Sequence, residues 1–442
     1  MSAAAQRRRR ARSPREPAAG ARPAPAPAPA PTAARGDAVV ALALALAAAL
    51  FRLPGLGVPG EEYFDEVYHA KTALEYLEGR TPTEWVHPPT AKLLIAVGVW
   101  LFGYEPWAWR LMPALAGVAL APVFYLLARR VLPTRRAALL AALLLLCDGV
   151  YLVQSRIAMT NIFAVLFQVT AAYFVVRSVR EERLPPGAMT AAGLFLGLAL
   201  STRWTSLWAA GFLGLVLLVV RGRRLARPRE LALAALAFGA LPLAVYVLSY
   251  VPWMAQGNAI GNLPAYTKAI WRYHADLRAE HPYFSAWYTW PLLARPTWYF
   301  FRQVEETIRG VVAIGNPALW WASVPATLWA LVTGLRHRDP RRVFCGAGFL
   351  CLYLPWGIAP RTLNYSHYLF EAIPYACLSL GLILERGWEG RAAPLAKGYV
   401  GAVVLLFFFF LPFLAALPVP ASWYYFTVFD RVRPWTWFPS WV

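Results

Sequence analysis

The sequence carries little charge, and acidic residues are especially few. Only 15% of its 442 residues are charged, and 23 acidic residues stand against 43 basic ones. Soluble proteins contain about 25% charged residues, so the composition excludes an ordinary water-soluble protein. Hydrophobic residues make up 59% of the chain, which is typical of a protein that crosses a membrane many times.

Cysteine is scarce as well. The four cysteines all lie inside apolar runs, at Cys147, Cys345, Cys351 and Cys377. Their spacing fits neither a disulfide framework nor a zinc site. The formal net charge of +20 comes from short basic clusters between apolar segments, which is the pattern of cytoplasmic loops. We therefore expect a lipid bilayer, and no nucleic acid, as a partner.

What the chain does contain is a series of apolar segments that predict about eleven membrane spans. These segments cover residues 38–53, 108–130, 136–153, 157–179, 187–201, 204–220, 230–251, 312–335, 342–358, 367–385 and 396–417. With this number of spans, the basic clusters all fall on one side, which the positive-inside tendency makes cytoplasmic. We predict an all-α polytopic membrane protein with a cytoplasmic N-terminus and an external C-terminus.

Residues 1–36 are rich in Arg and then alternate Ala with Pro. This composition predicts a disordered basic tail rather than a cleaved signal peptide, so the membrane domain is expected over residues 37–442. Residues 90–103 are apolar but fall short of the roughly 20 residues that a span needs. We predict an interfacial helix there, inside an external loop of residues 54–107. Residues 252–311 and 418–442 are also predicted to be external.

The first external loop contains two adjacent carboxylates, Asp65 and Glu66. Ionisable groups held against a bilayer are costly and by default indicate function. The alternative interpretation is that they cap a helix running through Tyr76. Neighbouring side chains on a helix diverge by about 100°, so the two do not form a matched acid and base. One of them suits a general base, and the other suits orientation of the acceptor or of a neighbour.

Basic residues at the external end run against the positive-inside tendency. The other polar residues expected there are His87, Lys92, Arg110, Asp148, Arg156, Asn161, Arg203, His281, Arg295, Arg361 and His367. Each long cation is explained equally well by snorkelling to lipid headgroups, but as a group they favour an anion site. A sugar on a polyprenyl phosphate suits such a site. Its phosphate leaves without protonation, so transfer needs only a base for the incoming hydroxyl and cations for the phosphate.

Short motifs then follow one another in a recognisable order. They are Phe64-Asp65-Glu66-Val67-Tyr68-His69-Ala70, His87-Pro88-Pro89, Arg110-Leu111-Met112-Pro113, Gln154-Ser155-Arg156, Ser201-Thr202-Arg203-Trp204, His281-Pro282-Tyr283, Trp287-Tyr288-Thr289-Trp290-Pro291-Leu292, Gly315-Asn316-Pro317, His367-Tyr368-Leu369 and Trp437-Phe438-Pro439-Ser440-Trp441. Through these motifs, residues 38–442 resemble the protein O-mannosyltransferase family. The last motif is similar to the ending of the bacterial members.

The resemblance implies a GT-C fold and an inverting glycosyltransferase. Such an enzyme moves a mannosyl or other hexosyl group from a polyprenyl phosphate to Ser or Thr hydroxyls of exported proteins, at the external face of a bacterial plasma membrane. Asp65 would be the general base, with Glu66 assisting at the acceptor. The donor phosphate would be bound by Arg110, Arg156, Arg203 and Lys92. Further candidates for substrate or loop contacts are His87, Asn161, His281, Trp287, Arg295, Arg361 and His367.

Two departures from the family pattern stand out. Residues 252–311 are too short for the β-trefoil domain of the eukaryotic enzymes, and they predict an aromatic lid whose rings stack on substrate or anchor in the membrane interface. Asn161 stands where many members have an acidic residue, which weakens a metal bridged by two external acids. We predict no protein metal site, and a divalent cofactor is left open.

Two other functions remain as alternatives. One is a transferase of the same fold that acts on a glycolipid, similar to the lipid A aminoarabinose transferases. The other is a lipid or solute transporter, which predicts charged or broken helices deep within the spans of two corresponding halves. The polar residues of this chain gather at one face instead.

Overall fold

The computed structural model describes residues 35–359, 361, 363–428 and 433–441. The predicted basic tail of residues 1–36 therefore lies almost wholly outside the described residues. Within them, every predicted span overlaps a helix or a pair of consecutive helices. By length and hydropathy, six of the described helical segments are able to cross a membrane.

The helices of the bundle are α1 (Arg35–Arg52), α4 (Pro106–Val131), α5 (Arg135–Leu146), α6 (Gly149–Gln154), α7 (Asn161–Ser178), α8 (Pro186–Leu200), α9 (Ser206–Arg221), α10 (Pro228–Ala235), α11 (Leu241–Ser249), α14 (Pro317–Arg336), α15 (Pro340–Tyr353), α16 (Ile373–Gly387) and α17 (Ala393–Leu414). Asp148 lies between α5 and α6. The Asp148 carboxylate accepts hydrogen bonds from the backbone N–H groups of Tyr151 and Asn316 and from the Trp320 indole. Asp148 is therefore a buried helix cap.

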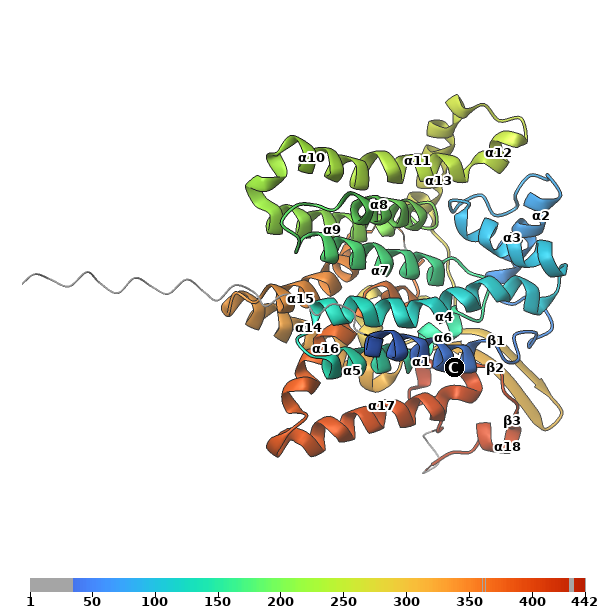
Figure 1. Cartoon of the computed structure of the whole chain (residues 1–442). Coiled ribbons are helices and arrows are strands. Elements are labelled where there is room, and N and C mark those ends of the chain that lie inside the picture. Colours follow the sequence, from blue (N-terminus) through green and yellow to red (C-terminus); the bar gives the residue numbers. More distant parts are fainter. Residues whose placement is uncertain (1–34, 360, 362, 429–432, 442) are drawn as a thin grey trace, which may run out of the picture.

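Shorter elements connect the bundle helices. They are α2 (Glu66–Leu77), α3 (Thr90–Phe102), α12 (Val251–Ala255), α13 (Leu263–Asp276) and α18 (Ala421–Tyr424). Helices α2 and α3 lie at the same end of the bundle as the strands, on the right in Figure 1. Helix α3 has 13 residues, which is too short to span a bilayer, and its length agrees with the predicted interfacial helix.

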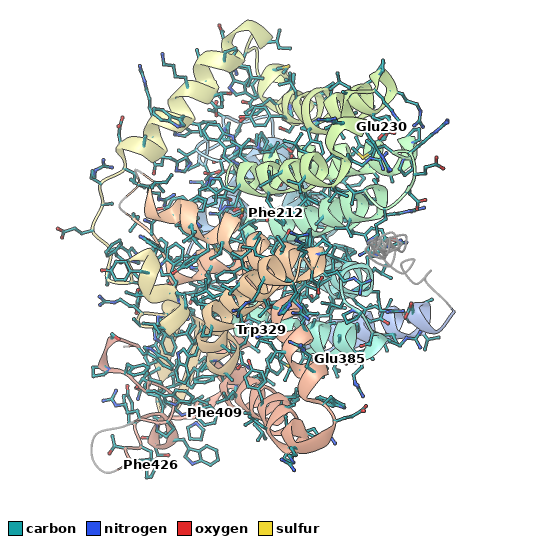
Figure 2. All side chains as sticks on the ribbon, turned by 90° about the vertical axis from the view of Figure 1, so that its left-hand side faces the viewer. Phe212, Glu230, Trp329, Glu385, Phe409 and Phe426 are labelled. Carbon is teal, nitrogen blue, oxygen red and sulfur yellow. The ribbon has the colours of Figure 1, made fainter. Side chains whose placement is uncertain are left out.

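Close packing holds α3 against α4. A Cβ added at Gly98 would lie 2.2 Å from the carbonyl oxygen of Ala108, so only glycine permits this approach. In the interior of the bundle, Phe212 packs against Phe344 and Tyr375 at ring distances of 5.3 and 5.4 Å. Figure 2 shows Phe212 near the middle of the molecule. Residues 54–107 thus pack on a dense helical bundle.

A small antiparallel sheet departs from the all-α prediction. Strand β1 (Thr297–Val304) pairs with β2 (Thr307–Ala313), and β2 pairs with β3 (Val419–Pro420). The helical fold class is confirmed, and this hairpin is a local exception to it within residues predicted as an aromatic lid and the start of a span. Their aromatic and β-branched residues favour strands. The first residues of β1 are buried and its last residues are exposed, so the hairpin projects outward (Figure 1).

Candidate active site

Asp65 lies immediately before α2 and is half-buried. It occupies the N-cap position, but its side chain makes no capping hydrogen bond. Among the hydrogen bonds and ion pairs between described residues, none involves its carboxylate. Burial raises the pKa of Asp65 to about 6, Glu84 adds to the effect, and Arg361 and Arg203 oppose it. The capping interpretation is therefore not supported, and no described residue holds the carboxylate.

The residue before this carboxylate has an unusual backbone. Phe64 adopts φ 53°, a left-handed conformation that bulky residues rarely adopt. Its ring stacks on Tyr299 of β1 with a centroid distance of 4.1 Å, and the Tyr299 hydroxyl accepts a hydrogen bond of 2.7 Å from Gln154. The hairpin thereby sets the direction of Asp65. The sequence does not indicate Tyr299, because its partners Phe64 and Gln154 are remote in the chain.

Glu66 points away from Asp65 into the protein. It is fully buried and forms a bidentate pair with Arg110, with N–O distances of 2.8 and 2.7 Å. It also accepts a hydrogen bond of 2.9 Å from the backbone of Ala158. Arg110 donates its remaining N–H groups to the carbonyl oxygens of Leu56, Pro59 and Glu61. Since a guanidinium has five N–H groups, Arg110 has none left for a phosphate.

Arg156 is used in a similar way. Its Nη1 contacts the carbonyl oxygens of Phe51, Arg52 and Pro54 at 3.2, 2.9 and 2.7 Å, and its Nη2 donates to Gly55 at 3.0 Å. These carbonyl groups belong to the end of α1 and the residues that follow it. Arg156 therefore caps the C-terminal end of this helix, where a cation is favourable.

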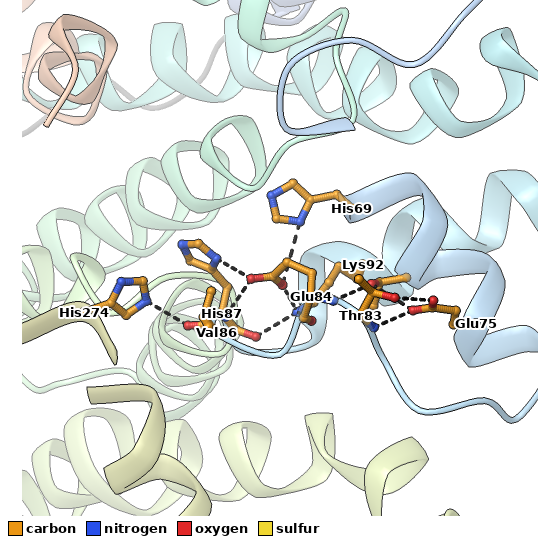
Figure 3. A network of polar contacts seen from close by, with 9 residues as sticks. His69, Glu75, Thr83, Glu84, Val86, His87, Lys92 and His274 are labelled. Atoms are coloured by element: carbon orange, nitrogen blue, oxygen red, sulfur yellow. Dashed lines mark hydrogen bonds and ion pairs between the residues drawn. The ribbon is translucent and has the colours of Figure 1, made fainter. Parts of the chain in front are cut away.

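Lys92 belongs to a network around Glu84, which Figure 3 shows. Its buried ammonium donates to the backbone carbonyls of Glu84 and His87, both at 2.8 Å, and to the Glu84 carboxylate. These contacts use its three N–H groups. The His87 ring contacts the same carboxylate at 2.8 Å. Burial raises the pKa of Glu84, but Lys92 and His87 outweigh it and hold that pKa well below its usual range.

Arg203 and Arg361 differ from these cations. Their guanidinium groups lie 4.9 and 5.9 Å from the centre of one ring, that of Tyr368. Arg203 is 3.7 Å from the carboxylate of Glu371 and donates no side-chain hydrogen bond to a described residue. Both arginines act on the pKa of Asp65. The structure thus brings two cations from distant segments to one aromatic ring, that of Tyr368.

Two further predicted candidates, His367 and Asn161, are buried. His367 stacks on Tyr365 with a centroid distance of 5.4 Å, and its ring lies edge-on to Tyr299 at 5.5 Å. Its Nδ1 has no partner among the described residues, and neither does the side-chain amide of Asn161. Asn161 begins α7, just after the segment that binds Glu66.

The remaining predicted candidates lie in the segment before the hairpin. His281 accepts a hydrogen bond from the backbone of Tyr283 and contacts Tyr365 at 5.2 Å. Trp287 packs on Tyr353. Arg295 is half-buried, and its Nε has no partner within the described part of the chain. His281 alone of these is linked through Tyr365 to the ring of Phe64. Within the described residues, no group of three His, Cys, Asp or Glu side chains is arranged to hold a metal.

Comparison with known proteins identifies the family. Residues 42–109 and 105–254 match the model of dolichyl-phosphate-mannose-protein mannosyltransferases, and residues 259–441 match the C-terminal four-transmembrane region of protein O-mannosyltransferases. The chain belongs to this family. Family membership makes it a multi-span membrane glycosyltransferase, as predicted, and does not favour the aminoarabinose transferase or transporter alternatives.

Curated relatives of this mannosyltransferase agree. The polyprenol-phosphate-mannose–protein mannosyltransferase of Mycolicibacterium smegmatis is 30% identical over 89% of this chain and 91% of the relative. The protein of the same name from Mycobacterium tuberculosis is 28% identical over 86% and 87% of the two chains.

Two solved structures show the same fold. The Saccharomyces cerevisiae Pmt1–Pmt2 complex bound to its sugar donor matches with a TM-score of 0.77 and 14% identity, covering 89% of this chain and 93% of that one. ArnT from Cupriavidus metallidurans bound to undecaprenyl phosphate matches with a TM-score of 0.56 and 18% identity, covering 87% and 75%. The predicted GT-C fold is confirmed.

Proposed function

We propose that this protein transfers mannose from polyprenyl phosphate mannose to Ser or Thr hydroxyls of exported proteins, with inversion at the anomeric carbon. The relatives' names support the donor and the protein acceptor. The observation that carries the mechanism is that the Asp65 carboxylate has no hydrogen-bond partner among the described residues, while its neighbour Glu66 is bound to Arg110.

Asp65 acts as the general base. It takes the proton from the acceptor hydroxyl as the hydroxyl oxygen forms a bond to the anomeric carbon. The bond between that carbon and the phosphate oxygen breaks, and its electron pair leaves with the polyprenyl phosphate. A pKa of about 6 for Asp65 keeps most of the carboxylate ionised at neutral pH and close to the range best suited to proton transfer.

Arg203 and Arg361 bind the phosphate and stabilise its growing charge. Both guanidinium groups face the ring of Tyr368, and both favour the ionised form of Asp65. Arg110 and Lys92, predicted at the phosphate, receive positioning roles because protein acceptors use all of their N–H groups. Arg156 receives a positioning role because both N–H groups of Nη1 and one of Nη2 face the backbone carbonyls at the end of α1. Glu66 likewise holds the loop rather than the acceptor.

A groove beside Arg203 suits the isoprenoid tail of the donor. It has a volume of about 620 Å³ and lies between α8, α9, α11 and α13. Its walls are mostly apolar, and they include Leu200 and Trp204, which flank Arg203 in the sequence. A tail in this groove would bring its phosphate toward the segment that contains Arg203.

The site faces the exterior in this proposal. Residues 54–107, 252–311 and 418–442 would lie outside the membrane, because the basic clusters end up on the other side. The short helix α3 supports this topology, since a span at that position would reverse every later segment.

A transfer assay tests the proposal. Purified full-length protein in nanodiscs is given synthetic polyprenyl phosphate mannose with either a Ser/Thr peptide or a glycolipid acceptor, and the product linkage is determined by NMR. We expect α-mannosyl peptide from a β-linked donor. Transfer only to the glycolipid, or product with retained configuration, would overturn it.

A further inference from the structure

His274 links three segments that are far apart in the chain. It lies on α13, and its Nε2 is 2.8 Å from the carbonyl oxygen of Val86 in the first external loop. Its Nδ1 is 3.3 Å from Nη1 of Arg361, which precedes α16. Figure 3 shows the imidazole extending from α13 toward the loop that carries Glu84 and His87.

These two contacts define the chemical form of the ring. A carbonyl only accepts hydrogen bonds and a guanidinium only donates them. Nε2 therefore carries the proton and Nδ1 is the acceptor, which is the neutral imidazole. Burial lowers the pKa of His274, and Arg361 and Arg203 lower it further, so the neutral form is the one expected at pH 7.

The loop end of this link is itself rigid. The His87 ring lies 5.1 Å from that of His274, and the backbone carbonyl of His87 accepts a hydrogen bond from Lys92. Glu84, which also contacts Lys92, anchors the same turn. The carbonyl of Val86 is consequently held in place, and through His274 it helps to position Arg361.

We propose that His274 is a positioning residue that holds the Arg361 guanidinium at the phosphate site by joining it to the first external loop. The proposal rests on the function proposed above, because it assumes that Arg361 binds the donor phosphate. Arg361 has a second fixed contact, from its Nε to the carbonyl of Leu363 at 2.7 Å. Together the two contacts leave one orientation for the guanidinium over Tyr368.

The test compares His274→Gln with His274→Met in the full-length protein. The two new side chains are similar in shape, but only Gln keeps a donor and an acceptor. We expect His274→Met to raise the KM for polyprenyl phosphate mannose about tenfold, as for loss of a hydrogen bond to a charged group, with a smaller change in kcat. His274→Gln should stay within about threefold of the wild type. His337→Phe, an exposed histidine elsewhere, is the neutral control.

A double-mutant cycle separates positioning from packing. In an Arg361→Ala background, His274→Met should have no further effect on the donor KM, because the interaction is already absent. A full tenfold effect in that background contradicts the proposal, and so does a wild-type KM in His274→Met alone. If His274→Met does not fold, His274→Phe retains the ring and takes its place in the cycle. Absence of transfer by the wild type would instead overturn the proposed function.

Discussion

Asp65 and Glu66 are neighbours in the chain, but they belong to regions of different character. Around Glu66, the charges are buried and saturated: Arg110 donates every N–H group to a protein oxygen. Around Asp65, the carboxylate has no hydrogen-bond partner among the described residues, and Arg203 and Arg361 face an aromatic ring. Saturated charges hold a loop in place, whereas unsaturated charges remain available to a substrate.

The largest expected effect comes from Asp65→Asn. The substitution removes the base but no intramolecular hydrogen bond between described residues, so transfer should fall by about 10³-fold while the protein stays folded. The measurement is initial transfer rate together with the thermal unfolding midpoint. Near-normal activity in a well-folded variant would show that another group takes the proton.

Glu66→Leu should destabilise the region around the Glu66–Arg110 ion pair. It leaves the buried Arg110 cation without its carboxylate, which costs about 3–5 kcal/mol of folding free energy. The unfolding midpoint should drop clearly, and lost activity should follow lost folded protein. Asp65→Leu is the matched control, because it changes the adjacent carboxylate in the same way without breaking an ion pair between described residues. Equal destabilisation by both variants would contradict the distinction.

Arg203→Gln should have a moderate effect. It removes a cation that we propose binds the phosphate, and we expect the donor KM to rise about tenfold. The unfolding midpoint should fall less than in Glu66→Leu, because Glu371 keeps hydrogen bonds from Gln168 and Thr205. Arg156→Gln provides the comparison, because Arg156 caps α1 and its loss should lower stability before it changes donor affinity. If Arg156→Gln instead raised the donor KM without lowering stability, Arg156 would be a phosphate ligand.

The smallest expected effect is the dependence of activity and stability on pH. Because the pKa of Asp65 is raised to about 6, the base is protonated and activity falls as pH drops through about 6. The same shift disfavours the ionised folded state above the unfolded pKa, so Asp65→Asn should be slightly more stable than the wild type at pH 7. That difference should vanish below about pH 4. Unfolding midpoints across this range, with kcat/KM profiles, measure both.

The sequence indicated Asp65 and a set of candidate cations, but it did not rank them. The family resemblance implied a phosphate role for Lys92, Arg110 and Arg203 alike, and the predicted topology placed all three at the same end of the bundle. Their difference lies in partners that are distant in sequence, such as Glu66 for Arg110 and Tyr368 for Arg203. The contact of Tyr299 with Phe64 was not predicted for the same reason. The hairpin was not predicted because its residues are apolar and aromatic, like those of the neighbouring segments.

The sequence by itself determined the membrane class, the helical segments, the family and the loop that carries Asp65, because these depend on hydrophobic runs and on short motifs that are local in the chain. Only the tertiary structure decided which of two adjacent carboxylates is free. The start of α2 turns Glu66 toward Arg110 and leaves the Asp65 side chain without a partner among the described residues. Such a choice depends on which distant donors each side chain meets after folding.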